Sequence, residues 1–338
     1  MRDIQSWYQQ LLAPSDALVD DIRRLEGDIL ILGAGGKMGP ALARLTRQAI
    51  RKAGVDKRVV AVSRYSEAGL RASLEEEGIE TIGADVLEEA ELAALPLCRN
   101  VLYLAGTKFG TSGNESYTWA MNSYLPGRVA EKYRDSRIVV FSTGNIYPLT
   151  PVVMGGAAED HTPGPLGEYA QSCLGRERMF QHFSKKYGTP VLIYRLNYAN
   201  DVTYGVLLEI GRSVRAGQPI DLKMGHVNVV WQGYANEVAI RALHHCAAPA
   251  KVLNVTGPET LSVRWIAKEF GALFGKEPVF VGAGEPTALL SNAAECMRLM
   301  GYPGVTVGEM IRLLAGWLES GGRTIQKETH FQERGGKY

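Results

Sequence analysis

The sequence predicts an α/β protein built on a doubly wound parallel sheet, followed by a smaller C-terminal lobe. From Asp28 to about Arg195, short apolar runs alternate with segments of helical periodicity. This alternation is typical of parallel strands joined by helices that cover both faces of a sheet. After Arg195 the alternation becomes irregular, which indicates a separate lobe. The first apolar run ends in a cluster of glycines, and in such sheets ligands bind beyond the carboxyl ends of the strands.

The individual elements follow from these patterns in chain order. Each expected strand is a short apolar run, whereas each expected helix places apolar residues three or four positions apart. The expected core strands are 28–32, Arg58–Val62, Glu80–Gly83, Asn100–Leu104, Arg137–Ser142 and Pro190–Arg195. The helices expected between them are Ala41–Ala53, Glu67–Glu77, Glu88–Ala94, Ser116–Tyr133 and Gly167–Tyr187.

The C-terminal part contains fewer strands and more helices. The strands expected there are Val227–Trp231 and Lys251–Val255. The expected helices are Tyr204–Ala216, Ala235–His245, Val263–Phe274, Asn292–Met300 and Val307–Leu318. The last residues are polar and contain glycine, so we expect them to be irregular.

Length and composition narrow the functional classes. The chain has 338 residues, 46% of them hydrophobic, which is enough for one large core and a lobe. The net charge of +1 gives no electrostatic reason to expect nucleic acid or an acidic membrane as a partner. The four cysteines are far apart, so we expect neither a metal site nor a disulfide framework. With no apolar run near the ~20 residues of a membrane span and no apolar signal region, we expect a cytoplasmic protein.

The glycine cluster directly follows the first strand. Gly33, Gly36 and Gly39 have GxxGxxG spacing, and a helical pattern begins after them. A strand, a glycine turn and a helix start in this order form a phosphate-binding corner, because a Cβ would keep a phosphate from the backbone. The first N–H groups of the helix then face the pyrophosphate of a dinucleotide. The cofactor contacts predicted in this loop are Gly33, Gly35, Gly36, Lys37, Met38 and Gly39.

This spacing resembles that of the extended short-chain dehydrogenases/reductases, the NAD-dependent epimerase/dehydratase family. Two later segments are similar to the family as well: Val252–Val263 resembles its returning strand and helix start, and Gly301–Pro303 resembles its usual ending. The resemblance implies a Rossmann-like core and a substrate-binding lobe. The expected divisions are a helical N-terminal extension (1–27), an NAD(P)-binding core (28–198, rejoined by 225–256), a substrate-binding lobe (199–224 and 257–325) and a tail (326–338).

The end of the second strand distinguishes NAD from NADP. An acidic residue there would accept hydrogen bonds from the ribose 2′-OH and repel a 2′-phosphate. Here the strand ends in Ser63 and Arg64, which would donate to that phosphate, although a solvated arginine is the alternative. NADP is therefore the preferred cofactor, and NAD is the alternative. By resemblance, Asp85 and Val86 after the third strand lie near the adenine, and capping the next helix is another role open to Asp85.

The fourth strand leads into Leu104–Lys108, which resembles the same strand exit in UDP-galactose 4-epimerases. In that family a small pair of residues lets the cofactor pass, and the lysine approaches the cofactor and the substrate. The resemblance therefore assigns Ala105, Gly106 and Lys108 to the cofactor, while an ordinary surface position suits Lys108 equally. Asn122 matches the family's structural asparagine in the next helix and is assigned to the cofactor side.

The chemistry of this family needs a tyrosine, a Ser or Thr hydroxyl, and a lysine one helical turn after the tyrosine. Thr143 stands four residues before Tyr147, as the family spacing requires, and is the candidate hydroxyl that positions the substrate. Tyr169 matches the tyrosine of the YxxxK motif, which exchanges the proton and contacts the cofactor. The position of the lysine is Cys173. Without the lysine charge, a tyrosine with a pKa near 10 is only about 0.1% ionised at pH 7.

Three interpretations of this departure are open. In the first, another cation takes the place of the lysine, and the candidates are Lys37, Lys108 and Arg176. In the second, Tyr169 acts only as a neutral acid, and His161 or Glu168 handles protons. In the third, the chain binds a dinucleotide and a sugar-like ligand without turnover, as a sensor or scaffold.

The substrate side is less specific. The expected contacts are Thr143 and Asn145 at the fifth strand, Asn197 after the sixth, and Trp231, which lines the lobe or packs between the two parts. The leading function is an NAD(P)-dependent oxidoreductase of the epimerase/dehydratase type that transfers a hydride on a sugar, nucleotide-sugar or related polyol or carbonyl substrate. The resemblance also implies a homodimer formed through the helices near 116–133 and 167–187.

Overall fold

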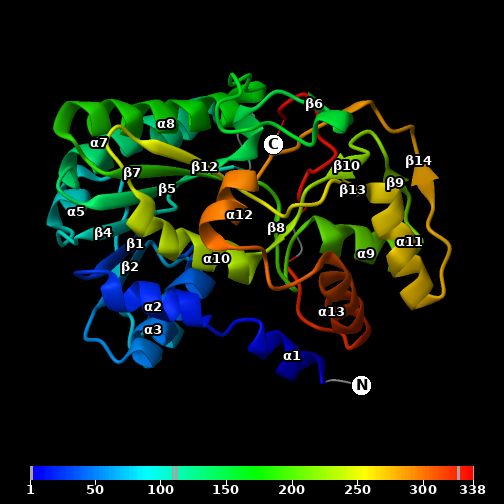
Figure 1. Cartoon of the computed structure of the whole chain (residues 1–338), viewed down its shortest axis with the longest axis horizontal. Coiled ribbons are helices and arrows are strands. Elements are labelled where there is room, and N and C mark those ends of the chain that lie inside the picture. The colour runs from blue at the N-terminus through cyan, green and yellow to red at the C-terminus, as the bar shows by residue number, and fades with distance from the viewer. Residues whose placement is uncertain (1–2, 109, 111–112, 326–327, 338) are drawn as a thin grey trace.

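Seven parallel strands form one sheet in the order β12-β7-β5-β4-β1-β2-β3 (Figure 1). The computed structural model describes residues 3–108, 110, 113–325 and 328–337. The strands of the sheet are β1 (Ile29–Leu32), β2 (Val59–Ser63), β3 (Glu80–Gly83), β4 (Asn100–Tyr103), β5 (Arg137–Thr143), β7 (Val191–Leu196) and β12 (Lys251–Val255). The strand order changes direction between β1 and β4, which places a crevice at their carboxyl ends. The sheet confirms the predicted Rossmann-like architecture.

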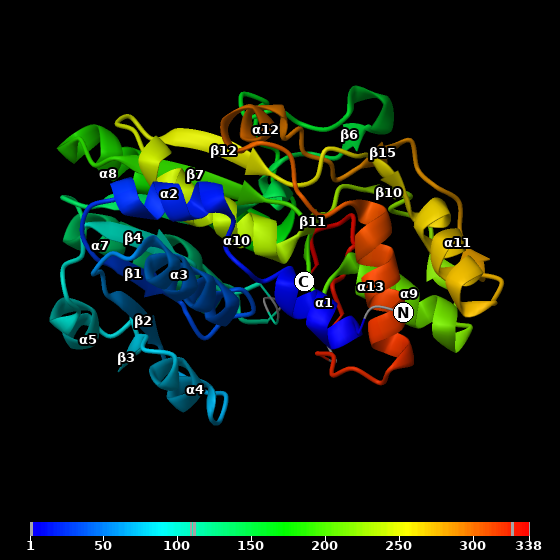
Figure 2. The same cartoon turned by 60° about the horizontal axis from the view of Figure 1, so that its bottom comes forward.

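Helices cover both faces of this sheet (Figures 1 and 2). One face packs against α2 (Asp16–Arg24), α3 (Gly39–Ala53) and α10 (Gln232–Arg241), which continues into a short 3₁₀ turn at Ala242–His245. The other face packs against α5 (Glu89–Ala94), α7 (Leu125–Lys132) and α8 (Gly167–Tyr187). Both layers are apolar, and this is why the strands of the sheet are almost continuously hydrophobic. Two shorter helices, α4 (Leu70–Glu76) and α12 (Ala294–Met300), lie at the margins.

The helix expected over Ser116–Tyr133 is not one regular α-helix. It consists of α6 (Glu115–Trp119), a π-helical turn at Ala120–Tyr124, and α7. Pro126 stands in the first turn of α7, and its ring has no N–H and crowds the carbonyl four residues earlier. The wider turn accommodates the proline, and Asn122 within it is fully buried against α8.

The C-terminal lobe has its own hydrophobic core. Its main helices, α9 (Val206–Ala216), α11 (Val263–Phe274) and α13 (Val307–Glu319), pack together, and α1 (Ile4–Gln10) from the N-terminus lies against α13 (Figure 2). The short strand pairs of the molecule are β8 (Ala199–Asn200) with β11 (Val230–Trp231), β10 (His226–Val227) with β13 (Leu261–Ser262), β9 (Ile220–Asp221) with β14 (Phe280–Val281), and β6 (Thr150–Pro151) with β15 (Thr287–Ala288).

The strand expected at Val227–Trp231 is interrupted. Its two ends belong to β10 and β11, which pair with different partners. The buried Asn228 between them donates to the carbonyl of Glu259 and accepts from the N–H of Ser291. These two side-chain bonds fix the backbone between the strands and prevent one continuous ladder.

The described tail residues contain neither helix nor strand, yet they are tightly held. Phe331 is 1% exposed in the core of the lobe. Arg334 donates to the carbonyl and hydroxyl oxygens of Thr287. A Cβ at Gly336 would lie 2.2 Å from the carbonyl oxygen of Leu166, just before α8. The tail therefore connects the lobe with the start of α8. No helix among the described residues is long and apolar enough to cross a membrane.

Candidate functional site

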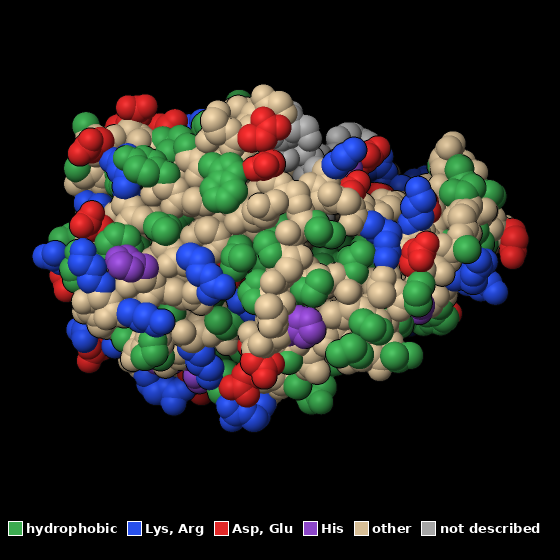
Figure 3. All heavy atoms as spheres, turned by 90° about the horizontal axis from the view of Figure 1, so that it is seen from above, with side chains coloured by type: hydrophobic (Ala, Val, Ile, Leu, Met, Phe, Trp, Pro, Cys, Tyr) green, Lys and Arg blue, Asp and Glu red, His purple; other side chains and the backbone are tan. Residues whose placement is uncertain are grey.

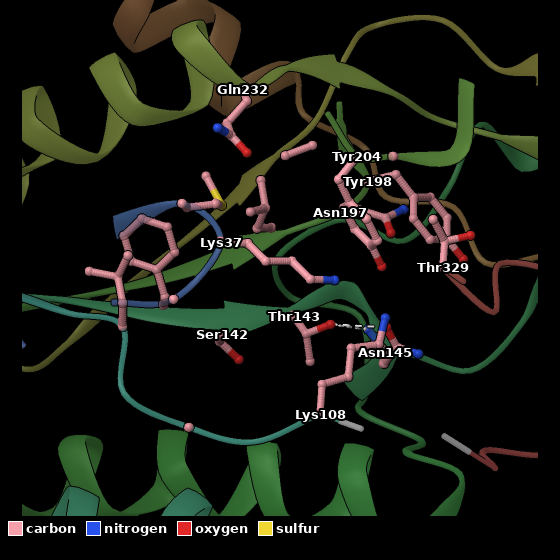
Figure 4. A pocket seen from close by; sticks show the side chains of 18 of the residues that line it. Lys37, Lys108, Ser142, Thr143, Asn145, Asn197, Tyr198, Tyr204, Gln232 and Thr329 are labelled. Atoms are coloured by element: carbon pink, nitrogen blue, oxygen red, sulfur yellow. Dashed lines mark hydrogen bonds between the residues drawn. The ribbon is translucent and has the colours of Figure 1, made fainter. Parts of the chain in front are cut away.

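A cavity of about 360 Å³ opens where the carboxyl ends of β1, β4, β5 and β7 meet the lobe (Figure 4). Its floor is the glycine loop between β1 and α3, and its walls come from the loops after β4, β5 and β7. The side chains that line it and enter the argument below are Lys37, Lys108, Thr143, Asn145, Tyr169 and Asn197. Segments more than one hundred residues apart in the chain therefore meet at one place.

Close backbone packing shapes the glycine loop. Gly33 has a φ of +92°, and a Cβ there would lie 2.6 Å from the backbone nitrogen of Ala105. A Cβ at Gly39 would lie 2.4 Å from the carbonyl oxygen of Ala34. At Gly36 a Cβ would approach only the carbonyl oxygen of Gly33, at 3.4 Å. The first and third glycines thus allow the chain to pack against itself, whereas the second leaves the space above the loop open.

The start of α3 suits an anion. Met38 occupies the N-cap position and makes no side-chain hydrogen bond to the first turn, so these backbone donors lack a side-chain cap. The helix dipole adds partial positive charge at the same place. Lys37 projects from the loop into the cavity, where its ammonium lies 3.2 Å from the centroid of the Tyr204 ring (Figure 4). The loop and the helix start therefore form an open, electropositive cradle.

Tyr169 and Thr143 form the chemical centre of the cavity. Both side chains line it, and the two hydroxyl groups are hydrogen-bond partners. Thr143 ends β5 and caps the following 3₁₀ turn, where it accepts from the N–H of Asn145 at 3.2 Å. Burial raises the pKa of Tyr169 well above its ordinary value. At neutral pH the tyrosine therefore holds its proton.

Cys173 lies one helical turn after Tyr169 and is completely buried. Its thiol is within hydrogen-bonding reach of the tyrosine hydroxyl, and burial raises the pKa of the thiol. A neutral thiol supplies no positive charge to the tyrosine. It packs with Ile146, Tyr147 and Ala157 in a small apolar cluster.

Lys108 reaches the same centre from the loop after β4. Its side chain lines the cavity, and its ammonium lies 5.7 Å from the centroid of the Tyr169 ring. Burial lowers the pKa of Lys108 to about 8. Figure 4 shows Lys37 and Lys108 projecting into the cavity from two separate loops.

Asn122 does not line the cavity but holds its wall. Its side chain accepts from the N–H of Thr107 at 3.0 Å and donates to the carbonyl of Thr107 at 2.8 Å. It also donates to Ser172 on α8 at 3.0 Å. The asparagine expected on the cofactor side thus fixes the loop that carries Gly106 and Lys108.

Arg176 is buried behind this wall. It donates to the carbonyl of Phe141 at 2.7 Å and to the side-chain oxygen of Asn122 at 2.6 Å. A Cβ at Gly106 would lie 2.2 Å from one of its guanidinium nitrogens, so glycine is required there. Arg176 itself does not line the cavity.

A buried polar network that the sequence did not reveal supports β5. Glu177 on α8 and Arg195 on β7 form a two-pronged ion pair, with N–O distances of 3.0 and 2.8 Å. Ser142 donates to Glu177 at 2.5 Å, and Arg195 donates to the hydroxyl of Tyr147 at 2.6 Å. Tyr147 in turn donates to Asn254 on β12. The network joins three strands and α8 directly behind Thr143.

The residues expected at the adenosine end lie outside the cavity. Arg64 is exposed, and its guanidinium is 3.6 Å from a carboxylate oxygen of Asp85. Ser63 lies against the glycine loop, because a Cβ at Gly35 would be 2.3 Å from its hydroxyl oxygen. Val86 and Ala105 belong to the hydrophobic layer on the α7–α8 side of the sheet. These residues border the loop and the adjacent strand ends without enclosing a ligand.

On the substrate side, Asn145 and Asn197 line the cavity, whereas Trp231 does not. Trp231 is buried in the core of the lobe because its ring packs against Tyr8 and its indole N–H donates to the carbonyl of Leu11. Its role is therefore packing. The lining residues that sequence reasoning did not assign to the site include Tyr198, Tyr204, Gln232 and Thr329. They come from four separate segments, namely the end of β7, the turn before α9, the start of α10 and the tail, so no single local pattern marks them.

The two proton carriers suggested as alternatives lie elsewhere. Glu168 accepts from the indole N–H of Trp119 at 2.5 Å, and the His161 ring packs edge-on against Tyr147. Neither side chain lines the cavity. Among the residues that the structure describes, no group of three or more His, Cys, Asp or Glu side chains is placed to hold a metal ion.

The fold and the site together define a Rossmann-type protein whose glycine corner faces a tyrosine–threonine pair. The chain belongs to the NAD dependent epimerase/dehydratase family, because the model of that family matches residues 29–199. This match confirms the resemblance drawn from the glycine spacing. A comparison with curated proteins finds no match.

Solved structures of similar proteins support the same fold. UDP-glucuronic acid 4-epimerase from Bacillus cereus, in complex with NAD, is 18% identical and has a TM-score of 0.71 over 87% of this chain and 97% of that one. UDP-glucose 4-epimerase from Thermus thermophilus, also in complex with NAD, is 19% identical, with a TM-score of 0.67 over 86% and 99% of the two chains. The epimerase Mth375 from Methanothermobacter thermautotrophicus is 16% identical, with a TM-score of 0.70 over 90% and 96%.

Proposed function

We propose that this protein is an NAD(P)-dependent oxidoreductase of the epimerase/dehydratase type that acts on a sugar, a nucleotide sugar or a related polyol or carbonyl compound. One observation carries the proposal. The same cavity is lined by the glycine loop before α3 and by the hydroxyl pair of Tyr169 and Thr143. An anion cradle beside a proton-exchanging pair is the combination that dinucleotide-dependent redox chemistry requires.

The residues of the loop fit a dinucleotide. The open space above Gly36 and the uncapped start of α3 suit its pyrophosphate, and Lys37 adds a cation beside it. Gly106 and Lys108 border the path toward Tyr169. When bound, the nicotinamide exchanges a hydride with a carbon of the substrate.

The proton is handled by residues of the chain. Thr143 would hold the reacting oxygen of the substrate, and the accompanying proton would move between this oxygen and the Tyr169 hydroxyl. Because its pKa is raised by burial, Tyr169 is ready to donate a proton, whereas taking one requires positive charge nearby. Asn145 and Asn197 line the cavity beside Thr143 and offer hydrogen bonds to a polyol.

The solved relatives favour a nucleotide sugar among the possible substrates. The Bacillus cereus enzyme has been solved with UDP-glucuronic acid and NAD. We propose residues 199–224 and 257–325 as the substrate-binding lobe, and we assign the substrate to the side of the cavity that is lined by Ala199, Tyr204 and Val206 of this lobe. Tyr198 from the end of the core and Thr329 from the tail line the same cavity.

We further propose that NADP is preferred over NAD. Arg64 is exposed at the end of β2, beside the glycine loop, where it is available to a 2′-phosphate. Its ion pair with Asp85 is long, at 3.6 Å, and both side chains are open to solvent, so the pairing would compete weakly with a phosphate.

The direct test measures ligand binding and then turnover. Thermal shift with NAD, NADH, NADP and NADPH, each alone and with UDP-sugars, should show stabilisation by a dinucleotide and a larger shift with the phosphorylated pair. Conversion of the UDP-sugar that stabilises best should then appear as a change in absorbance at the nicotinamide or as an epimeric product. Failure of every dinucleotide to bind at millimolar concentration would refute the proposal.

A second function is favoured by Cys173, which stands where the family has a lysine. The chain would then bind a dinucleotide and a sugar-like ligand as a sensor or scaffold without turnover. The variant Cys173→Lys separates the two functions, provided that circular dichroism verifies its fold. If activity appears only in this variant, the natural protein is the binding module. If the unaltered protein already turns over a sugar nucleotide, it is an enzyme.

We also propose a cytoplasmic homodimer formed through α6, α7 and α8. Trp119 and Tyr124 are exposed at 39% and 62% on this helical surface. Figure 3, which views the molecule from the side that carries α7 and α8, shows hydrophobic side chains interspersed among charges of both signs. Light scattering during size-exclusion chromatography would give the mass, and a monomer at micromolar concentration would contradict the dimer.

A further inference from the structure

The cavity has a tyrosine but lacks the family's lysine one turn later. In the family this lysine lowers the pKa of the tyrosine and holds the nicotinamide ribose. The buried thiol of Cys173 does neither, because it is uncharged and a weak donor. If the chain has the proposed function, on which this inference rests, then another side chain supplies the missing positive charge.

Lys108 has the required position. It lines the cavity together with Tyr169 and Thr143, and its ammonium is 5.7 Å from the centre of the Tyr169 ring. The backbone just before Lys108 is held in place, because the Asn122 side chain hydrogen-bonds to both the N–H and the carbonyl of Thr107. The amine is therefore presented to the tyrosine by a fixed loop instead of a helix.

The other two cations are less suitable. Arg176 is occupied by the carbonyl of Phe141 and the side chain of Asn122, and it lies behind the cavity wall. From there it adds a constant positive charge near Tyr169 but cannot contact a ligand. Lys37 belongs to the glycine loop, and its ammonium lies over the ring of Tyr204. A pyrophosphate bound at this loop would be its partner.

We propose that Lys108 is the displaced equivalent of the family's lysine: its ammonium contacts the nicotinamide end of the dinucleotide and supports proton exchange at Tyr169. The positive charge has moved from α8 to the loop after β4, while the tyrosine and the threonine hydroxyl have kept their places. A loop lysine suits this role because its long flexible side chain brings the ammonium into the cavity beside Tyr169.

This position gives Lys108 a distinctive pH dependence. Burial lowers its pKa to about 8, so its charge is present below this pH and is lost above it. The groups around it are Tyr169 and Cys173 on α8, with Arg176 near both of them, and Lys37 lines the same cavity from the glycine loop. Burial raises the pKa of both Tyr169 and Cys173, so neither group masks a change of charge on Lys108 near pH 8.

The test measures the affinity for NADPH and NADH by nicotinamide fluorescence, in three variants and across pH. Lys108→Met should weaken binding about tenfold at pH 7, whereas Lys108→Arg, which keeps the charge, should stay within about threefold. Lys268→Met, an exposed lysine on α11 away from the cavity, is the matched control and should bind normally. The affinity of the unaltered protein should fall between pH 7 and pH 9, and in Lys108→Arg this fall should disappear.

Each outcome has a distinct meaning. Normal affinity and an unchanged pH profile in Lys108→Met would overturn the assignment of Lys108 while leaving dinucleotide binding intact. The same would follow if Lys108→Arg bound as weakly as Lys108→Met, because size and not charge would then matter. Failure of the unaltered protein itself to bind either dinucleotide would instead remove the proposed function together with this inference.

Discussion

The glycine corner before α3 and the start of α8 face each other across one cavity, yet they follow the family to different degrees. At the corner, the spacing agrees with the family, and close contacts between backbone atoms leave no room for a Cβ at Gly33 or Gly39. At α8, Tyr169 is in place but the lysine position is a buried cysteine. The difference shows that a site built from backbone tolerates little change. A site built from side chains leaves room for the move of a charge between elements that we propose for Lys108.

The largest expected effect concerns Tyr169 at the start of α8. Tyr169→Phe removes the hydroxyl that faces Thr143, so turnover of a true substrate should fall about 10²–10⁴-fold, as is usual when a general acid is lost. Dinucleotide affinity should change little, because the glycine corner is untouched. Steady-state kinetics and fluorescence binding measure the two effects separately.

Thr143→Ser is the control for this experiment, because it keeps a hydroxyl at the end of β5 and should keep most of the activity. Undiminished turnover in Tyr169→Phe would show that a group other than Tyr169 carries the proton, and the first two interpretations of the altered motif, which both use this tyrosine, would then be wrong.

The variant Gly33→Ala should disrupt the glycine corner before α3. Its Cβ would lie 2.6 Å from the backbone nitrogen of Ala105 at a φ of +92°, so the turn must move. We expect a loss of at least about 2–3 kcal/mol in the free energy of unfolding and a loss of dinucleotide binding. Urea unfolding and thermal shift measure these effects.

The control variant Gly54→Ala separates the cost of a positive φ from the cost of a steric clash with the added Cβ. Gly54 also has a positive φ, at +67°, but a Cβ there meets nothing within 4 Å. Only the left-handed conformation is penalised, by about 1–2 kcal/mol, and binding should be retained. If both variants bind and unfold alike, close packing does not shape the corner.

The same contrast explains what the sequence could predict. The bounds of α8, β3 and β12 were predicted to the residue, because apolar periodicity and terminal glycines are local signals. The π-helical turn before α7 and the break between β10 and β11 were missed. They depend on Pro126 in its helical context and on the tertiary bonds of Asn228.

The candidate site divides in the same way. The glycine loop, Thr143, Tyr169 and Lys108 were predicted and lie together, because each stands at or after the carboxyl end of a strand or in the first turn of a helix. Thr329 was not predicted. It reaches the cavity only because Phe331 anchors the tail in the core of the lobe, and the backbone N–H of Thr329 donates to Glu209. Such long-range packing leaves no periodic trace in the sequence.

The smallest expected effect concerns Arg64, at the adenosine end of the proposed cofactor site and outside the cavity. Arg64→Gln should reduce the affinity for NADPH about tenfold, the magnitude of one charge-assisted contact, and leave NADH almost unchanged. Because Arg64 is exposed and pairs with Asp85 only at 3.6 Å, the folded state should lose almost nothing. Calorimetric titration of both dinucleotides gives the ratio of the two affinities directly.

An equal change in the affinities for NADPH and NADH would mean that Arg64 contacts the part that the two dinucleotides share. A preference for NADH in the unaltered protein would reverse the cofactor assignment. Either result would leave the glycine corner as the part of the chain that determines dinucleotide binding. It would also show that the end of β2 does not select between the two cofactors.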